Sequence, residues 1–401
     1  MSKLTNTTLM WLLWMVSPSL SAQNPLFKDW AARIPISDSG FVEINQYIQF
    51  WNVISLRYSG LEVDPRLDPH IRRGRLGVSG RLSSKVLFNA SFAYDGVGKD
   101  PSTTAAGVPN AEDNTTFFPR DIQITYRAHP LLNITTGYFR PRAGKESINS
   151  SSFCISQEKG LPSFHPRIHV TGRGIGRETG INVGGLYTGS SFSLLYDAGL
   201  FDPNHPTIRG DGPIWSPLIC SRVVFMLGDR EMTEYLTTYF QSGFGERKSV
   251  SIGFSHAYQS RTNLFRNNGF YGTDLQINWG PLDVVGEWLW LHRDSPLNNG
   301  SSLRTIDQSY VIKAAWNVPD NWGGAWQFCV MYTGDKSDTM FARQVNPFTQ
   351  ATPHTQWSGG VNWLLNRNKL KLGLHIANGR RIGNGVFDNY TYLNPSLQFM
   401  M

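Results

Sequence analysis

Residues 249–258 read Ser-Val-Ser-Ile-Gly-Phe-Ser-His-Ala-Tyr, and this stretch shows the pattern on which the fold of the chain depends. Its larger side chains occupy every second position, from Val250 to Tyr258, and small or polar side chains lie between them. Successive side chains of a strand point to opposite faces of a sheet. The stretch therefore predicts a β-strand with one apolar face and one small or polar face.

The same alternation recurs along the whole chain, and no long stretch shows the 3.6-residue period of a helix. Short connections alternate with long ones, which span 96–117, 140–180, 201–218, 293–307, 334–355 and 378–390. Strands of about ten residues with short turns at one end and long loops at the other are typical of transmembrane barrels. About sixteen such segments can be placed, and they begin near Val42, Ile71, Lys85, Asp121, Leu132, Ile181, Phe192, Ile219, Val250, Tyr271, Leu282, Tyr310, Trp326, Trp357, Leu370 and Leu393.

These segments predict an all-β fold, namely a transmembrane antiparallel β-barrel of about sixteen strands. One connection, from Gly228 to Lys248, breaks the series, because it should be a short turn and is not. A soluble β-sandwich is the alternative, since its strands also alternate, but it needs one shared dry core. The polar face of each strand is rich in Gly, Ser, Asn, Gln and charged residues, which favours the barrel.

The composition agrees with a barrel and excludes other classes. Of the 401 residues, 17% are charged and 13% are aromatic, and the mean hydropathy is −0.29. So many rings exclude a disordered chain. A helical membrane protein is also excluded, because no uncharged apolar run approaches the roughly 18 residues of a spanning helix. In a barrel the rings lie on one face of each strand and the polar residues on the other, which explains a hydrophilic average.

The N-terminus has the pattern of an export signal. Lys3 precedes an apolar run, and small residues follow up to Ala22, as in a signal peptide. We therefore expect a signal peptide at 1–22, a short N-terminal segment at 23–40 and a barrel domain at 41–401. The expected location is the outer membrane of a Gram-negative cell.

If the apolar faces of the strands meet lipid, the opposite faces line a lumen. Arg73, Arg75 and Arg127 fall on these inner faces, and so do acids such as Asp95 and Asp274. A purely structural lattice of ion pairs would also line the lumen with both positive and negative side chains. For any one of these residues, both interpretations stay open.

The long connection 140–180 is more informative, since a loop of this length is usually functional. It carries seven basic residues against three acids, a net charge of +4. Rings of Arg and Lys at a constriction favour anions, and the guanidinium fork matches phosphate oxygens. We expect this third loop to fold inward, as one long loop does in porins; at an outer rim its cations would instead bind lipopolysaccharide phosphates. The candidate pore-lining residues are Arg73, Arg75, Arg127, Arg140, Arg142, Lys145, Arg167, Arg173 and Arg177.

The same loop resembles that of a known family, the phosphate-selective porins O and P. The stretches that carry this resemblance are, in order, Gly-Tyr-Phe-Arg-Pro-Arg-Ala-Gly-Lys-Glu at 137–146, Ser-Ser-Ser at 150–152, Glu-Lys-Gly-Leu-Pro at 158–162, Pro-Arg at 166–167 and Gly-Arg-Gly-Ile-Gly at 172–176. Weaker matches lie at 73–77, 283–287 and 360–366. The resemblance covers roughly 40–401.

The resemblance implies a sixteen-stranded, homotrimeric porin surrounded by outer-membrane lipid and lipopolysaccharide. Its implied function is a water-filled diffusion channel for small anions, with phosphate or polyphosphate as candidate solutes. Anion selectivity in this family depends on a basic ladder and a lysine cluster, whereas the region after the ninth segment here holds Arg261 and Arg266 but no lysine cluster. A general or sugar-type porin without anion preference is therefore the alternative. We expect no cofactor and no nucleic-acid partner.

Two patterns that could indicate a cofactor or metal site are weak. The glycines of 172–176 are not followed by the helix and the Lys-Ser/Thr of a nucleotide-binding loop. His165 and His169 have the spacing of a metal site on a helix, but Pro166 between them argues against a regular helix. The three cysteines are too few for a disulfide framework, although one pair could form a bridge after export: Cys154, Cys220 and Cys329.

An outer-membrane barrel hydrolase is the remaining enzyme alternative. Such an enzyme needs a Ser/His or Asp/His constellation on the rim or on the lipid face. His256 lies beside Ser255, but neighbours in a strand point to opposite faces, so no triad is indicated. We expect no catalytic residue and no metal ligand.

Overall fold

The computed structural model describes residues 32–58, 61–99, 117–203, 214–236, 238, 240–296, 301–336, 354–383 and 386–401. The predicted signal peptide at 1–22 lies outside the described residues, and so does the predicted N-terminal segment up to residue 31.

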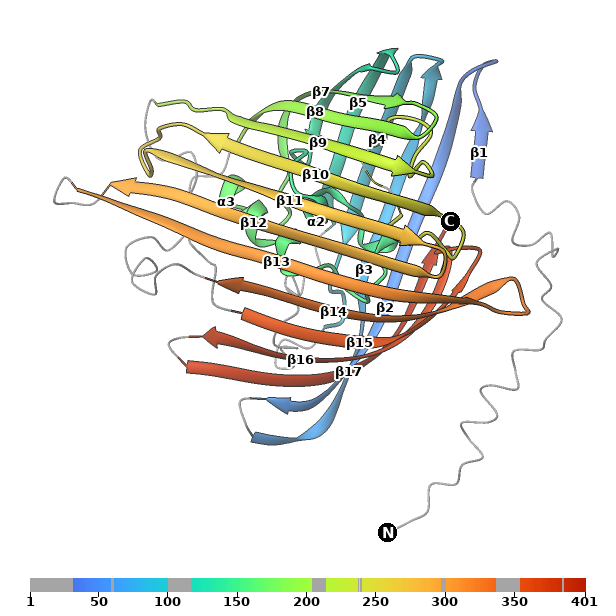
Figure 1. Cartoon of the computed structure of the whole chain (residues 1–401), viewed down its shortest axis with the longest axis vertical. Helices are drawn as coiled ribbons and strands as arrows, with labels where there is room; N and C mark the ends of the chain where they lie inside the picture. Colours follow the sequence, from blue (N-terminus) through green and yellow to red (C-terminus); the bar gives the residue numbers. More distant parts are fainter. Residues whose placement is uncertain are drawn as a thin grey trace.

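The chain folds into a closed antiparallel barrel (Figure 1). Strands β2 to β17 pair in chain order, and β17 pairs with β2, so that sixteen strands form a ring. This confirms the predicted fold and the predicted number of strands. The strands of the ring are β2 (Phe41–Tyr58), β3 (Leu61–Ser83), β4 (Val86–Tyr94), β5 (Phe118–His129), β6 (Leu132–Phe139), β7 (Glu178–Thr188), β8 (Phe192–Asp202), β9 (Leu218–Gly228), β10 (Lys248–Gln259), β11 (Asn267–Trp279), β12 (Leu282–Pro296), β13 (Ser302–Pro319), β14 (Gly324–Lys336), β15 (His354–Leu365), β16 (Leu370–Gly383) and β17 (Val386–Met400).

A short additional strand lengthens the seam where the ring closes. β17 pairs with β2 from Tyr390 opposite Tyr58 down to Met400 opposite Tyr47. Below that point β1 (Ala32–Pro35) pairs with the first residues of β2. The backbones of Gln46 and Met401 exchange two hydrogen bonds, of 3.1 and 2.9 Å. The first strand of the ring therefore has a main-chain partner from Phe41 onward.

The two ends of the barrel differ in their connections. At the turn end, as we name it, connections such as 130–131 and 320–323 have only two to four residues. The longer connections gather at the opposite end, the loop end, which is at the left of Figure 1. Barrels of this class turn their short connections to the periplasm and their long ones to the outside. The connection 229–247 is the exception at the turn end.

Three strands begin earlier than the alternation predicts. β3 begins at Leu61, β13 at Ser302 and β17 at Val386, whereas the predicted starts were Ile71, Tyr310 and Leu393. The predicted long loops 293–307 and 378–390 are therefore mostly strand. One face of these extensions is still covered, since Asp68, Asp307 and Tyr390 are at most 2% exposed. Exposed side chains such as Arg304 and Asn389 are polar, so the outer face there lacks an apolar signal.

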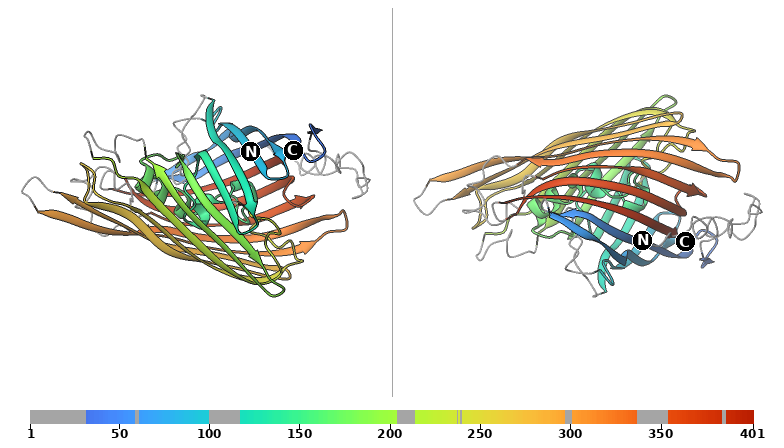
Figure 2. Two further views of the ribbon diagram at one scale, coloured as in Figure 1. Left: turned by 90° about the horizontal axis from the view of Figure 1, so that it is seen from above. Right: turned by 90° about the horizontal axis from the view of Figure 1, so that it is seen from below.

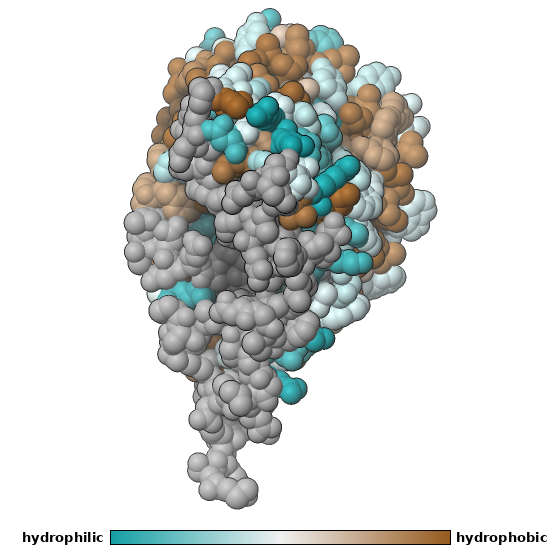
Figure 3. Space-filling model, turned by 90° about the vertical axis from the view of Figure 1, so that its left-hand side faces the viewer, coloured by the Kyte–Doolittle hydropathy of each residue, from teal (hydrophilic) through white to brown (hydrophobic). Residues whose placement is uncertain are grey.

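The two faces of the wall differ as predicted. On β5, the outward Ile122, Ile124 and Tyr126 are 45%, 51% and 46% exposed. On β11, the inward Asp274 and Asn278 are at most 2% exposed, because the lumen beside them is filled. Figure 3 looks at the loop end and shows hydrophobic residues along the outer sides of the barrel and several hydrophilic residues nearer its middle. No helix in the described part of the chain is long and apolar enough to span a membrane.

Rings pack side by side on neighbouring strands of one half of the wall. The ring centroids of Tyr271 and Trp290 lie 5.6 Å apart, and those of Trp288 and Tyr310 lie 4.9 Å apart. Such rings are typical of the girdle at a membrane–water interface, where a flat side chain meets both lipid and head groups.

The disulfide that the sequence left open is absent. Cys154, Cys220 and Cys329 are all described, and each is a buried free cysteine.

A charge on the outer face should destabilise the barrel, whereas the same charge on the inner face should not. Ile124→Lys places an ammonium against lipid, which costs about 2–4 kcal/mol near the middle of the bilayer. Thr125→Lys, one residue away on the lumen face, is the matched control. Urea unfolding of both variants in lipid vesicles measures the difference, and equal stabilities would contradict the assigned orientation of β5.

Candidate functional site

The third loop, residues 140–177, folds into the barrel as predicted. It contains two short α-helices and two 3₁₀ turns: α2 (Lys145–Ile148), η2 (Ser151–Phe153), η3 (Leu161–Ser163) and α3 (His165–Thr171). Figures 1 and 2 show α2 and α3 inside the ring of strands. Most side chains between Arg142 and Thr171 are buried, so the loop fills part of the lumen.

Charged side chains of β12 and β13 hold the start of this loop. Glu287 of β12 accepts hydrogen bonds from the backbone N–H groups of Lys145 and Glu146. A carboxylate at a helix start satisfies donors that have no partner within the helix and complements the helix dipole. Glu146 in turn forms a fully buried ion pair of 2.9 Å with Lys313 of β13. These contacts press the loop against β12 and β13.

Two predicted pore-lining residues lie elsewhere. Lys145 turns toward the wall and forms an ion pair of 3.6 Å with Asp274, which also binds Arg222. Arg127 lies near the turn end and forms an ion pair of 2.5 Å with Glu234. Spacing in the sequence shows that a loop is basic, but it does not show which of its cations have carboxylate partners on distant strands.

The other seven candidates surround one cavity of about 660 Å³ between the third loop and the wall of β3 to β6. Ten basic side chains line it against three acids, an excess of seven positive charges. The basic residues are Arg72, Arg73, Arg75, Arg120, Arg140, Arg142, Lys159, Arg167, Arg173 and Arg177, and the acids are Asp95, Asp121 and Glu158. Arg72, Arg120 and Lys159 were not among the candidates from the sequence.

Two β-bulges explain why Arg72 and Arg120 face the lumen. In β3, Arg73 pairs with Gln49 and Ile71 with Phe50, which leaves Arg72 as an extra residue. In β5, Arg120 and its neighbour Asp121 together lie opposite the single residue Ser91. A bulge interrupts the alternation of faces and re-aims a side chain. The sequence signal that could have identified these two bulges is a pair of adjacent charged residues within an otherwise apolar strand.

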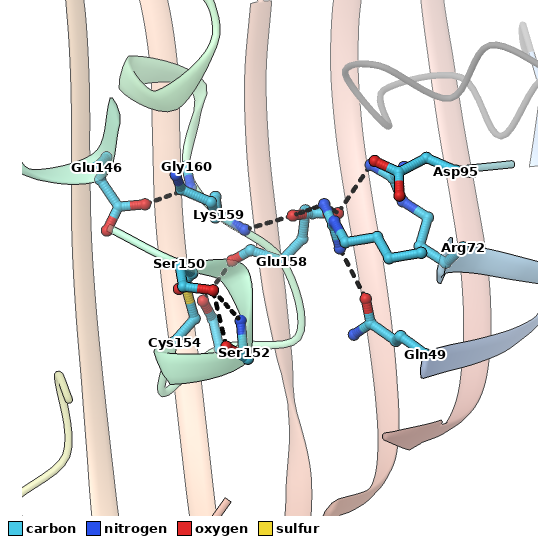
Figure 4. A network of polar contacts seen from close by, with 12 residues as sticks. Gln49, Arg72, Asp95, Glu146, Ser150, Ser152, Cys154, Glu158, Lys159 and Gly160 are labelled. Carbon is cyan, nitrogen blue, oxygen red and sulfur yellow. Dashed lines mark hydrogen bonds and ion pairs between the residues drawn. The ribbon is translucent and has the colours of Figure 1, made fainter. Parts of the chain in front are cut away.

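Each acid of the cavity is paired with arginine. Asp95 lies 3.3 Å from Arg120, and Asp121 binds Arg177 through two contacts of 2.9 and 3.0 Å. Glu158 points from the loop toward the wall (Figure 4) and binds Arg72 at 3.0 Å and Arg73 at 2.6 Å. Burial raises the pKa of Glu158, but Arg73 and Arg72 outweigh it and lower that pKa to about 2.

Three cations of the loop form no ion pair with a carboxylate of the described residues. Lys159 donates to the carbonyl oxygens of Asn149 at 2.7 Å and Ser147 at 3.3 Å, and Arg140 and Arg167 also donate to Ser147. Burial, followed by repulsion from Arg177, lowers the pKa of Arg167 to about 9. Burial and neighbouring arginines also lower the pKa of Lys159 and of Arg140. Such crowding of cations favours a negative ion beside them.

The two loop histidines do not form a shared site. α3 begins at His165 with Pro166 in its first turn, so the expectation that Pro166 prevents a helix was wrong; proline suits the first turn, where its missing N–H has no partner to lose. His165 lies 2.7 Å from Asp335 of β14, whereas His169 lies 2.9 Å from the carbonyl oxygen of His292. Within the described residues no group of three or more His, Cys, Asp or Glu could hold a metal.

The sequence matches no protein-family model and no curated protein. The fold is similar to that of the anion-selective porin from Comamonas acidovorans, with a TM-score of 0.58, 12% identity, and coverage of 90% of this chain and 100% of that one. It is also similar to OmpF of Salmonella typhi in complex with daunomycin (TM-score 0.57, 7% identity, 92% and 100% covered). A third similar structure is the outer membrane channel DcaP of Acinetobacter baumannii (TM-score 0.53, 11% identity, 92% of this chain and 99% of that one covered).

At these identities the likeness shows the fold alone. That fold is the barrel of Gram-negative outer-membrane porins, and a closed barrel with an apolar outer face belongs in that membrane.

Removal of the Glu158 carboxylate should loosen the loop. In Glu158→Gln, Arg72 and Arg73 lose the acid that they share, and breaking a buried pair in this way costs about 3–5 kcal/mol. Hydrogen exchange of the amides at 157–161 should therefore become faster. The control is Glu246→Gln, because its ion pair with Arg367 is largely exposed and contributes little. Unchanged exchange in the first variant would show that the pair does not hold the loop.

The same ion pairs should resist mild acid. The pKa of Glu158 is about 2 in the folded protein, below the usual value of about 4.3. The stabilisation is therefore complete above the usual value, falls progressively below it and is lost once the pH has fallen through about 2. Loop protection should stay constant from about pH 7 to about pH 5, as measured by hydrogen exchange with the intrinsic rate corrected at each pH. Marked deprotection within that range would contradict the assignment.

Proposed function

We propose that this protein is a porin, a water-filled diffusion channel that passes small anions down their gradient across the outer membrane. The observation that carries this proposal is the cavity beside the third loop, with its excess of seven positive charges. A cation entering it meets net repulsion, whereas an anion exchanges part of its hydration shell for guanidinium and ammonium donors. The description of one structural neighbour as an anion-selective porin supports the same choice.

The cations of the cavity differ in how free they are to meet a solute. Arg72, Arg73 and Arg177 already bind acids of the protein. Among the described residues, Lys159 and Arg140 bind carbonyl oxygens, and Arg167 binds the carbonyl and hydroxyl oxygens of Ser147. These uncharged oxygens leave the positive charge of the three side chains without an ion-pair partner. We therefore assign them the main part in attracting anions.

Among small anions, phosphate is the specific solute that the resemblance of the loop to the phosphate-selective porins implies. Several guanidinium groups around one cavity fit tetrahedral oxyanions, since their forks match two oxygens at a time. A general or sugar-type porin is the second candidate, and Phe118, Phe139 and Phe164 in the lining favour it, because aromatic rings offer apolar contact surface to a neutral solute.

The proposal includes a homotrimer in the membrane, with lipopolysaccharide phosphates around its loop end. Chemical cross-linking in native membranes tests the assembly, and a monomer as the largest product would contradict it.

In planar bilayers with a potassium chloride gradient, the reversal potential should have the sign set by chloride. Lys159→Gln combined with Arg167→Gln should lower the chloride-to-potassium permeability ratio by about fivefold per charge, because one charge at 4 Å contributes about 1 kcal/mol even in water. Lys85→Gln, at an exposed position of the turn end, is the control and should leave the ratio unchanged. A potassium-selective wild-type channel would refute the anion channel.

Phosphate added to a chloride solution should reduce the chloride current with saturation, because a bound oxyanion occupies the path of chloride. The same concentration of a neutral sugar is the comparison and should leave the current unchanged. A block by sugar alone would favour the sugar-type porin, and a block by neither would favour a general pore.

A further inference from the structure

The long connection at the turn end, described at residues 229–236, 238 and 240–247, enters the lumen. We name it the inserted turn. Met232 and Tyr235 are 5% and 7% exposed and pack with inward side chains of β7, β8 and β9. Gln241 is fully buried and Ser242 is 3% exposed. The third loop thus fills the lumen from one end, and the inserted turn fills it from the other.

The inserted turn is tied to the barrel wall by a buried polar network. The hydroxyl of Tyr235 donates to Asp197 of β8 and accepts from Asn182 of β7 at 3.1 Å. The hydroxyl of Ser242 and the backbone N–H of Gly243 donate to Asp283 of β12, at 2.7 and 2.9 Å. Buried hydrogen-bond networks of this kind hold the groups that form them in a fixed arrangement.

The inserted turn also contacts the third loop at several points. Arg142 of the loop donates to the Tyr235 hydroxyl at 2.6 Å. The Gln241 side chain donates to Glu146 at 2.7 Å and accepts from the N–H of Ile155 at 3.3 Å. The rings of Phe240 and Phe153 lie 4.3 Å apart. The inserted turn therefore supports the loop that carries the cations of the cavity.

Two residues of the inserted turn reach the expected path of the solute. Thr238 lines the cavity together with the cations of the loop. Glu234, whose side chain is 52% exposed, binds Arg81 of β3 at 3.0 Å and Arg127 of β5 at 2.5 Å. Both arginines lie at the turn end of strands that line the cavity further up. The carboxylate neutralises part of their charge on the periplasmic side.

We propose that the inserted turn is the periplasmic half of the channel filter. Thr238 narrows the path below the third loop, and Glu234 weakens the hold of Arg81 and Arg127 on a departing anion. Conduction requires binding that is strong enough for entry and weak enough for exit, and an exit lined by two unneutralised arginines would retain the anion. This inference rests on the proposed anion channel and names a specificity-determining carboxylate for it.

The first test removes the charge of Glu234. Glu234→Gln should raise the chloride-to-potassium permeability ratio by about twofold, since an exposed charge in salt solution acts weakly, and should lengthen the block of single channels by phosphate. Glu246→Gln is the matched control: it removes an equal charge from the same inserted turn, but its partner Arg367 is exposed and outside the cavity. An unchanged ratio in Glu234→Gln, or an equal rise in both variants, would overturn the role of Glu234.

The second test asks whether Thr238 lines the path. The native cysteines are at most 5% exposed, so an anionic methanethiosulfonate reagent should leave the wild-type channel unchanged. It should lower the conductance of Thr238→Cys at least twofold and leave Ser84→Cys, in an exposed short turn, unaffected. If mass spectrometry verifies that Thr238→Cys is labelled and its conductance is nevertheless unchanged, the proposal that Thr238 narrows the solute path is overturned.

The two proposals fail in different ways. A wild-type channel that does not conduct or that prefers potassium refutes the proposed function. A wild-type channel that prefers chloride, together with insensitive Glu234 and Thr238 variants, refutes only the role of the inserted turn.

Discussion

Hydrocarbon offers no hydrogen-bond partner to a peptide group, so the N–H and C=O groups of a membrane wall must bond within the sheet. The ring of sixteen strands meets this demand by pairing β17 with β2. The seam is irregular at two points: the register shifts between Thr391 and Tyr392, and the ladder skips between Leu393 and Ser396 around Pro395. There the N–H of Asn52 donates to the side chain of Asn394 at 3.2 Å. A side chain thus replaces a main-chain acceptor where proline disturbs the pairing.

Closure of the ring creates a lumen in which charge is distributed unevenly. Asp274, Asp283 and Glu287 on one side bind Lys145, the inserted turn and the start of α2. These three acids are therefore already paired with the segments of the third loop and the inserted turn that they hold in place. The opposite wall, from β3 to β6, faces the loop across the cavity with mostly basic side chains. The excess of positive charge in the cavity is thus a result of how the loop is attached.

The parts of this structure that the sequence predicts are those in which one physical demand acts on every second residue. On β10, Val250 to Tyr258 had to alternate because lipid lies on one side and the filled lumen on the other. Near the starts of β13 and β17, exposed side chains such as Arg304 and Asn389 are polar, so these first residues carry no such signal. Arg72 and Arg120 were missed because bulges shift the alternation locally. The orientation of Lys145 depends on Asp274, which is distant in the chain, and no local pattern reports such a partner.

The contacts of the third loop also constrain the order in which the barrel can assemble. The carbonyl oxygen of Ser152 accepts from Gln398 at 3.2 Å and from Asn368 at 3.0 Å, and Gln157 donates to the backbone of Asn394 at 3.1 Å. The loop thus binds residues 216 to 246 positions further along the chain, and contacts of such sequence separation form slowly. Until β17 takes its place in the wall, Ser152 and Gln157 lack their partners Gln398 and Asn394. Docking of the loop and sealing of the wall are consequently coupled steps of one late folding event.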